Sequence, residues 1–571
     1  MKPEYKKYIL ENIVKKKGVF ISIALIIIFG FIVYGNSLNG KFIWDDDKLI
    51  KESAYLKNLS FIPNFFIKDI GAGAGIKSGS YRPLQMITYL IDYSLWKLNV
   101  LGYHLTNILL HILVALGIYW FVDTLFADKL LAFFTSALFV VHPIHTEAVS
   151  YLSGRADPLA SLFMLLTFIL YLKQLHSQKM KLYILMLFSY IFALLSRENT
   201  LILPLLLLLY HYIFEQKVKG KEFFSILIVT LIYIVMRLTL LKALISQLSY
   251  STNLSQRLPG FFVAITNYIR LLLLPFGLHM EYGNPLFYLR DPKAVMGIAI
   301  FVLSLIYAAR KRNRNRLISF SIFWFFITLL PASNLYPINA YMAEHWLYLP
   351  SIGFFLILSK GLSWLYQRKG FRTFSLVLVI CLLTIYSYLT VRQNGYWKDP
   401  IVFYERTLKY APESTNMLNN LGILYFDMGR KEQGIALFNK AIKIDPADAY
   451  AYINLGYAYQ QIGKNKEAII LFEKALGLNP DNVTAYNHLG NAYSSINMHK
   501  EAIASYNKAI EIDPNFILAY YNLGILYSSI NMHEEAITSY KKAIEIDPNF
   551  ILARDKLNNL YSQNTGMGPR N

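Results

Sequence analysis

Three consecutive carboxylates follow the first long apolar run of the chain, in the stretch KFIWDDDKLI from Lys41 to Ile50. The simplest interpretation is a solvated cap beyond the end of a membrane helix. However, Phe42 and Trp44 flank the acids, and aromatic rings of this kind settle at the membrane–water interface. A carboxylate held near a low-dielectric surface has a raised proton affinity, which suits a general base acting on a hydroxyl group. Asp45 and Asp46 are therefore candidates for a catalytic base.

Two arginines stand out in other polar segments of the chain. Arg82 lies in the stretch SYRPLQMITYLIDY, residues 80–93, and Arg155 lies in HPIHTEAVSYLSGRADPLA, residues 142–160. A guanidinium beside a membrane surface pairs well with a lipid phosphate, because its fork of N–H groups matches the phosphate oxygens. Polar residues that cap two helix ends are the alternative interpretation for either segment. The arginines are candidates for binding an anionic lipid headgroup.

His142, His145 and Glu147 raise the question of a metal site, since imidazole and carboxylate groups are common metal ligands. A proline follows the first histidine, however, and the sequence has no second cluster of such residues. We therefore expect no resident metal and no obligatory cofactor, with a divalent ion as the less favoured alternative.

The elements that must position these residues are membrane helices. The chain has 571 residues, of which 55% are hydrophobic, and a mean hydropathy of +0.36, values typical of a polytopic membrane protein. The net charge of +20 comes largely from short basic runs between apolar segments, such as RKRNRNR at 310–316. This is the pattern of cytoplasmic loops and does not indicate a nucleic-acid surface. The single cysteine, Cys381, excludes an intrachain disulfide.

About 20 helical residues cross the hydrocarbon core of a bilayer. The first apolar segment has a basic start but no small-residue cleavage site, so we expect an uncleaved first helix with a cytoplasmic N-terminus. We expect eleven crossings, near residues 19–37, 102–126, 131–151, 157–173, 181–196, 199–214, 221–242, 294–310, 317–335, 346–366 and 373–391. A further apolar segment, 259–280, is expected to be re-entrant or to lie on the surface.

This topology places several polar segments on the face opposite the cytoplasm. They are the acidic loop (38–101), the segment 142–157, the turn 197–199 and the pair Glu344 and His345. Charged groups at the border of membrane segments are costly and usually mark a site. We expect these segments to converge.

From about residue 397 the sequence repeats itself. Proline recurs at 412, 446, 480, 514 and 548, and glycine at 422, 456, 490 and 524, both with a spacing of 34. Two amphipathic helices in 34 residues are the tetratricopeptide pattern. We therefore expect an all-α protein with a polytopic membrane domain, residues 1–396, and a soluble tetratricopeptide α-solenoid, residues 397–571. An odd number of crossings puts the repeats on the face of the acidic loop.

The motifs FIWDDDKLI, SYRPL, HPIHTEAVSYLSGRAD, SREN and EHWLYLPSIGF, followed by these repeats, resemble the transmembrane-and-tetratricopeptide O-mannosyltransferase family. The resemblance covers nearly the whole chain and implies a GT-C fold. It implies transfer of a sugar from a polyprenyl-phosphate carrier to a Ser or Thr hydroxyl of an exported protein, with inversion at the sugar. An acid in the first external loop would be the base, and no nucleotide sugar would be needed.

The resemblance also implies roles for individual residues. The acidic pair of the family falls on Asp45 and Asp46, and Asp45 is favoured as the base because it is the first acid after Trp44. The sugar donor and its phosphate would be bound by residues of the other motifs, namely Arg82, His142, His145, Glu147, Arg155, Asp157, Arg197, Glu198, Glu344 and His345. His345 stands where an arginine is expected and Arg197 where a lysine is common, so the sugar need not be mannose.

The repeats offer a second site. The residue before each Leu-Gly pair is Asn420, Asn454, His488 and Asn522, again 34 apart. These side chains could simply bond within the helix pair. Alternatively they line the concave surface and bind the backbone of an extended acceptor polypeptide, because an amide supplies both a donor and an acceptor.

Two other functions remain open from sequence alone. The chain could glycosylate a lipid or a polysaccharide, or it could be a non-catalytic membrane scaffold that assembles envelope machinery. A scaffold has no need of Asp45 together with Arg82. For the enzyme we expect a lipid-linked sugar and an exported polypeptide as partners, no nucleic acid, and a multi-pass location in a bacterial inner membrane, with the site on the non-cytoplasmic side.

Overall fold

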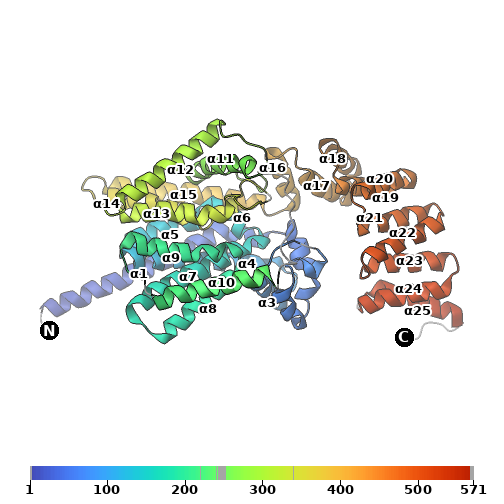
Figure 1. The fold of residues 1–571 in the computed structure, drawn as a ribbon, viewed down its shortest axis with the longest axis horizontal. Helices are drawn as coiled ribbons and strands as arrows, with labels where there is room; N and C mark the ends of the chain where they lie inside the picture. Colours follow the sequence, from blue (N-terminus) through green and yellow to red (C-terminus); the bar gives the residue numbers. More distant parts are fainter. Residues whose placement is uncertain are drawn as a thin grey trace. The chain divides into compact units, whose positions relative to one another are not determined.

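The computed structural model describes residues 3–76, 78–218, 220–239, 241, 253–283, 285–338, 340–548 and 550–565, and the described chain contains helices and no strands (Figure 1). The expected all-α fold class is confirmed. The chain divides into two compact units, unit 1 from Met1 to Arg406 and unit 2 from Thr407 to Asn571. The division falls inside helix α16 (Pro400–Tyr410), slightly after the expected boundary at 396/397.

Every apolar segment expected to cross a membrane contains a helix, because a helix satisfies its own backbone hydrogen bonds in hydrocarbon. The end of the expected segment 221–242 lies outside the described residues. The helices of unit 1 before α16 are α1 (Pro3–Tyr34), α2 (Ile62–Ile67), α3 (Pro83–Trp96), α4 (Val100–Phe126), α5 (Lys129–Val141), α6 (Thr146–Val149), α7 (Ala156–Ser177), α8 (Met180–Ser196), α9 (Leu203–Phe214), α10 (Gly220–Leu238), α11 (Leu254–Leu273), α12 (Pro292–Lys311), α13 (Arg316–Leu329), α14 (Ser351–Gln367) and α15 (Arg372–Tyr396).

Several of these helices have the length and composition of membrane spans. Among the described residues, five meet both criteria: Lys17–Asn39, Val100–Phe126, Leu152–Ser177, Pro292–Lys311 and Arg372–Tyr396. The bent pair Lys129–Val141 and Pro143–Val149 makes a sixth if it is counted as one span. The other apolar helices are shorter, so the expected eleven crossings stay a prediction.

The segment 131–151 differs from the expected continuous helix. Helix α5 ends at Val141, and the next helical piece is inclined by 55°. Pro143 explains the break, because the residue before a proline is disfavoured in the helical conformation. His142 is accordingly extended, with φ −77° and ψ 129°. The break frees residues 142–155 to fold across the end of the helix bundle.

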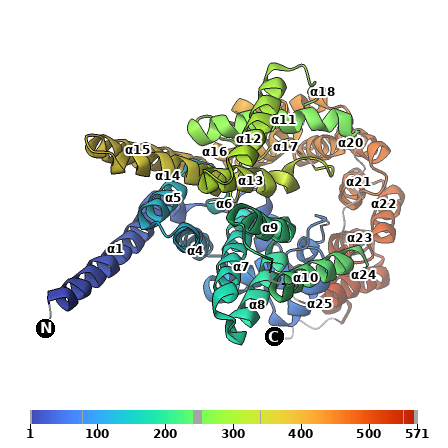
Figure 2. The same cartoon turned by 60° about the vertical axis from the view of Figure 1, so that its left-hand side comes forward.

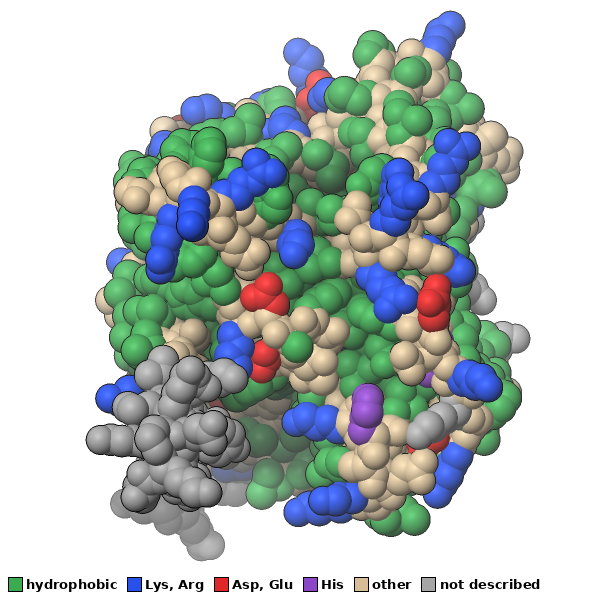
Figure 3. Space-filling view, turned by 90° about the vertical axis from the view of Figure 1, so that its left-hand side faces the viewer, with side chains coloured by type: hydrophobic (Ala, Val, Ile, Leu, Met, Phe, Trp, Pro, Cys, Tyr) green, Lys and Arg blue, Asp and Glu red, His purple; other side chains and the backbone are tan. Residues whose placement is uncertain are grey.

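The connections between the helices of unit 1 gather at two ends. Those between α7 and α8, α9 and α10, α12 and α13, and α14 and α15 share the end at which the chain begins (Figure 1). Arg316 pairs with Glu215 at 3.1 Å, and the Arg312 guanidinium lies 4.3 Å from the centroid of the Tyr212 ring, so two of these turns are in contact. Figure 3 looks onto this end and shows Lys and Arg side chains among apolar ones. The acidic loop lies at the opposite end.

Short helices between α1 and α4 form a small lobe that carries the acidic loop. Ile50, which follows the acids, packs in an apolar cluster with Met86 and Tyr89 of α3 and with Tyr103 of α4. This cluster fixes the acidic loop against α3, the helix that begins directly after Arg82.

Unit 2 consists of helix pairs that repeat every 34 residues, and Figure 2 shows them stacked into an arc. In each repeat a glycine of the first helix lies against an aromatic ring of the second, for example Gly456 against Phe472, where an added Cβ would come within 2.7 Å of the ring. The close crossing explains the recurring glycine. The helices are α17 (Thr415–Asp427), α18 (Lys431–Ile444), α19 (Ala449–Gln461), α20 (Asn465–Leu478), α21 (Val483–Ser495), α22 (His499–Ile512), α23 (Ile517–Ser529), α24 (His533–Ile546) and α25 (Ile551–Thr565).

Candidate active site

Asp45 is the exposed member of the acidic run. The chain turns at Trp44, which has φ 56°, and Asp45 follows at the start of a short helical turn. Tyr151 donates a hydrogen bond to Asp45 Oδ2 at 3.0 Å, and the Tyr151 ring stacks on Trp397 at 5.4 Å between centroids. Although Asp45 reaches the surface, desolvation by the surrounding protein raises its pKa, while the Tyr151 bond and the charge of Arg82 act in the opposite direction.

Asp46 is buried, with 1% of its surface exposed. Its Oδ1 accepts hydrogen bonds from Ser153 N–H at 2.9 Å and from Ser153 Oγ at 2.6 Å, and its Oδ2 accepts one from Ile43 N–H at 3.0 Å. Burial raises the pKa of Asp46 to about 7, against the effect of these bonds. The carboxyl group therefore ties the acidic loop to residues 152–155.

Asp47 differs from both neighbours. Its Oδ1 lies 2.6 Å from Lys51 Nζ in a solvent-exposed pair one helical turn apart. An exposed pair of this kind contributes little to stability. The three consecutive acids thus have three environments: Asp45 is exposed and oriented, Asp46 is buried and bound, and Asp47 is paired at the surface.

Arg82 lies between the exposed acid and a second acidic residue. It precedes α3, and its charge acts on both Asp45 and Glu198. Burial raises the pKa of Glu198, but the charges of Arg82, Arg197 and Arg237 outweigh that effect and lower it overall. Arg82 Nε, Glu198 Oε2 and Arg237 Nη1 are buried and have no hydrogen-bond partner among the described residues. Polar atoms left in this state are candidates for binding a ligand.

Arg197 also acts on Glu198, and its buried Nε has no hydrogen-bond partner among the described residues. Arg197 forms a buried ion pair with Asp157, so its charge is largely balanced. Arg237, near the end of α10, lies over the ring of Tyr81 at 5.4 Å from the centroid. The cationic group therefore consists of Arg82, Arg197 and Arg237, of which only Arg197 forms an ion pair with a described carboxylate.

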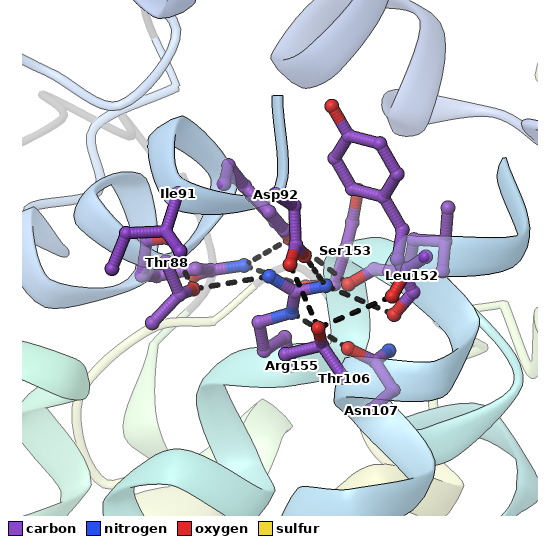
Figure 4. A network of polar contacts seen from close by, with 12 residues as sticks. Thr88, Ile91, Asp92, Thr106, Asn107, Leu152, Ser153 and Arg155 are labelled. Carbon is purple, nitrogen blue, oxygen red and sulfur yellow. Dashed lines mark hydrogen bonds and ion pairs between the residues drawn. The ribbon is translucent and has the colours of Figure 1, made fainter. Parts of the chain in front are cut away.

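Arg155 is fully buried and bound to protein on every side (Figure 4). Its Nη2 lies 2.6 Å from Asp92 Oδ2, and its Nε donates to Asn107 Oδ1 at 2.6 Å. The guanidinium also donates to Thr88 Oγ1 and to the carbonyl oxygen of Tyr103. This arrangement gives no support to the expected phosphate contact. It joins α3 and α4 to the segment that carries Ser153.

Glu147 and His345 form a separate polar pair. His345 donates its backbone N–H to Glu147 Oε2 at 2.9 Å, and its Nδ1 lies 2.5 Å from Oε1. The adjacent Glu344 is buried and accepts hydrogen bonds from His279 N–H at 2.6 Å and from Tyr282 Oη at 2.7 Å. Burial, followed by the charge of Glu147, raises the pKa of Glu344 well above its usual range.

His142 and His145 are bound to protein groups. His142 Nε2 lies 3.2 Å from the carbonyl oxygen of Leu272. His145 Nδ1 lies 2.9 Å from the carbonyl oxygen of Phe139, and its Nε2 lies 3.0 Å from Ser351 Oγ. In the described part of the chain, no group of three or more His, Cys, Asp or Glu residues is placed to hold a metal ion.

The four residues before Leu-Gly in the repeats are half-buried. Asn522 Nδ2 donates to Asn487 Oδ1 at 2.9 Å, across adjacent repeats, and His488 stacks on Phe472 at 5.7 Å between centroids. The side chains of Asn420 and Asn454 make no hydrogen bond to a described residue. For these two amides, the alternative interpretation, a hydrogen bond within the helix pair, therefore does not hold.

The structure brings the expected polar segments together at one end of unit 1, and it adds residues that sequence reasoning missed. Tyr151 and Ser153 lie inside the motif that supplied Arg155, and Asp92 is the last but one residue of the segment that supplied Arg82. Only the fold shows that they bind the acids and the arginine. The sequence did contain a sign that Arg237 is functional, because it is a charged residue inside an apolar segment.

The repeats match known family models. Residues 449–482, 483–516 and 517–550 match the tetratricopeptide repeat model, and residues 422–463 match a second model described as a TPR repeat. The solved structure named "Crystal structure of MamA" is 35% identical, covers 26% of this chain and 86% of that chain, and has a TM-score of 0.24.

The matches to curated relatives extend well beyond unit 2. Protein O-mannosyl-transferase F38B6.6 of Caenorhabditis elegans is 28% identical over 435 residues, covering 72% of this chain and 60% of the relative. Protein O-mannosyl-transferase TMTC1 of Homo sapiens is 27% identical over 481 residues, covering 70% and 52%. The chain spans about half the length of such relatives. The expected resemblance is confirmed: unit 2 is a tetratricopeptide-repeat domain, and the chain is similar, through much of unit 1, to proteins named protein O-mannosyl-transferases.

Proposed function

We propose that this chain is a membrane glycosyltransferase that transfers a sugar from a polyprenyl-phosphate carrier to a Ser or Thr hydroxyl of an exported polypeptide. The observation that carries the proposal is the exposed carboxylate of Asp45, oriented by Tyr151 and under the charge of Arg82. A base next to a cation can bind a hydroxyl acceptor and an anionic leaving group in one place. The names of the relatives support the coarser part of the proposal, the transfer of a sugar to a protein hydroxyl.

In the proposed reaction, the acceptor hydroxyl gives its proton to Asp45 while its oxygen attacks the anomeric carbon. The bond from that carbon to the phosphate oxygen breaks, and its electron pair stays with the departing polyprenyl phosphate. Attack from the side opposite the phosphate inverts the anomeric centre. The raised pKa of Asp45 makes the carboxylate a stronger proton acceptor than an ordinary aspartate.

The phosphate would bind at Arg82 and Arg237. Both guanidiniums have a buried N–H group without a partner among the described residues, and a phosphate oxygen would supply one. Arg155 would act through its neighbours, because its own donors are occupied. Asp46 would hold the loop through Ser153.

The repeats would bind the acceptor through Asn420, Asn454 and Asn522. On this proposal the site and unit 2 face the non-cytoplasmic side of the membrane, where exported chains emerge. The alternation of basic and acidic connections supports that orientation.

The test is transfer by the purified full-length protein in nanodiscs. Polyprenyl-phosphate mannose and other radiolabelled polyprenyl-phosphate sugars are supplied in turn, together with a Ser- and Thr-containing peptide. Label on the peptide that is released by alkaline β-elimination supports the proposal, provided that Asp45→Asn abolishes it. Label found only in lipid or polysaccharide, or no transfer from any carrier, overturns it.

A further inference from the structure

The inner wall of unit 2 is formed by the first helix of each repeat. Helices α17, α19, α21 and α23 contact one another from repeat to repeat, in addition to contacting the second helix of their own pair. The bond from Asn522 on α23 to Asn487 on α21 is one such contact. Stacked first helices therefore line the concave side of the arc in Figure 2.

One face of these helices is exposed and almost without charge. In α19 this face consists of Tyr450, Asn454, Tyr457 and Gln461, which follow the 3–4 residue spacing of a helix surface. The same four positions recur in the other first helices at intervals of 34. Of the sixteen residues at these positions, only Asp427 and His488 have an acidic or basic side chain. Burial lowers the pKa of His488 to about 4, so this histidine is neutral at pH 7.

The remaining side chains on this face are mainly apolar or amide groups. Ile423 is 39% exposed, Tyr457 37% and Ile525 39%, so the first, second and fourth repeats each expose a large apolar side chain at the same position. The third repeat has Asn491 there. The second helices differ, because Lys and Glu recur on their surfaces in pairs such as Lys508 with Glu511. The surface formed by the first helices is therefore nearly uncharged, whereas the surface formed by the second helices is charged.

We propose that the inner face of unit 2 selects extended polypeptide segments without charged side chains, rich in aliphatic and small hydroxyl residues. The inference rests on the proposed function only in taking such a segment as the acceptor. A charged side chain would lose water at this face without gaining a partner, which is costly. Aliphatic side chains would instead cover Ile423, Tyr457 and Ile525, and the amides would bond the main chain whatever its sequence.

The first experiment measures peptide binding to the full-length protein in nanodiscs by fluorescence anisotropy. Three extended peptides of equal length are compared: one built from Ser, Thr, Ala and Ile, one in which every third residue is Lys, and one in which it is Glu. The uncharged peptide should bind at least tenfold more tightly than either charged peptide. Its affinity should change less than twofold between 50 and 500 mM NaCl, because screening acts on charges. Equal binding of the three, or preference for a charged one, overturns the inference.

The second experiment compares matched variants. Ile525→Ala and Tyr457→Ala should each weaken binding of the uncharged peptide roughly three- to tenfold by removing apolar contact area. Ile470→Ala, which truncates a side chain that is 65% exposed on the second helix α20, should leave binding unchanged. All three residues are partly exposed, so the variants should unfold at the same temperature as the parent protein. Equal losses in all three variants overturn the inference.

The two proposals fail separately. If the uncharged peptide binds as expected but receives no sugar, the proposed reaction is wrong and the selectivity of unit 2 stands. If sugar is transferred equally to charged and uncharged peptides with equal affinities, the selectivity is wrong and the reaction stands.

Discussion

The Tyr151 hydroxyl donates a hydrogen bond to Asp45 at 3.0 Å, while Ser153, two residues further on, bonds the adjacent Asp46 through both its N–H and its hydroxyl. The segment 151–153 thus binds two neighbouring carboxylates, one exposed and one buried. Asp45 lies at the surface of unit 1, where Tyr151 orients it, whereas both oxygens of Asp46 accept hydrogen bonds from protein groups. On the proposed reaction, this difference assigns proton transfer to Asp45 and loop geometry to Asp46.

Replacing Asp45 by Asn should lower turnover by roughly 10²–10⁴, because the shape is kept but the base is lost. Asp46→Asn should lower turnover less, since the buried group already carries a proton much of the time at its pKa of about 7. Asp47→Asn is the matched surface control and should be nearly silent. Steady-state transfer assays with saturating sugar donor check this. Near-normal turnover in both Asp45→Asn and Asp46→Asn would show that neither acid is the base.

Tyr151→Phe should change the pH dependence of transfer. The lost hydrogen bond stabilises the ionised form of Asp45, so removing it raises the pKa of that carboxyl further. At a given low pH, less of the base is ionised, and the acidic limb of the pH–rate profile should move to higher pH. At high pH, where Asp45 is ionised in both proteins, the rates should converge. A uniform loss at every pH would indicate a packing defect at Trp397 instead.

Arg82→Gln and Arg237→Gln should each weaken the sugar donor more than the acceptor. Charge-assisted hydrogen bonds are worth about 1.5–3 kcal/mol, which corresponds to roughly 10- to 150-fold in kcat/KM for the sugar donor. The KM for the peptide should change little. Lys311→Gln, at the opposite end of unit 1, is the control for net charge. An effect of Lys311→Gln as large as that of Arg82→Gln would remove the argument for a local phosphate site.

Arg155→Met should destabilise unit 1 by about 3–5 kcal/mol, because it leaves the buried Asp92 without its counter-charge. The double variant Arg155→Met with Asp92→Leu should recover part of that loss, since no unpaired charge remains. Thermal unfolding in detergent measures both proteins. If the single variant were as stable as the parent but failed to bind the sugar donor, Arg155 would contact substrate directly after all.

Replacing Asn420, Asn454 and Asn522 together by Ala should weaken glycosylation of a full-length acceptor protein much more than that of a short soluble peptide. Each lost hydrogen bond costs about 0.5–1.5 kcal/mol, and only a long acceptor spans several repeats. Competition assays with both acceptors in one reaction give the ratio directly. An unchanged ratio would point to a folding defect or to a lipid acceptor.

Much of the architecture followed from pattern alone. Long apolar runs are helical because a helix satisfies its own backbone hydrogen bonds in hydrocarbon, and the spacing of 34 residues predicted the repeats together with their glycines. The break at His142 was missed, since the hydrophobic run continues through it and only Pro143 marks the turn. Hydropathy measures the length of an apolar segment and carries no information on a bend within it.

The sequence indicated which residues belong to the candidate site, but it did not indicate the role of each residue. Arg82 and Arg155 look alike in sequence, as cations beside apolar helices. The fold separates them, because Arg155 meets Asp92 and Asn107 from two other helices, whereas Arg82 keeps a buried N–H group without a partner. Such differences depend on contacts between distant segments, and no local pattern encodes them.

The turn at Trp44 has a mechanical consequence. A side chain other than glycine with φ near 56° is strained by about 1–2 kcal/mol, and here the strain sits one residue before Asp45. The contacts of the Trp44 ring with Phe403 and Tyr404, at 6.1 and 6.5 Å between centroids, hold the backbone in that conformation. A loop without these contacts would relax and turn the carboxylate away from Tyr151. The aromatic packing of Trp44 on α16 therefore offsets the backbone strain next to Asp45 and keeps the carboxylate beside Tyr151.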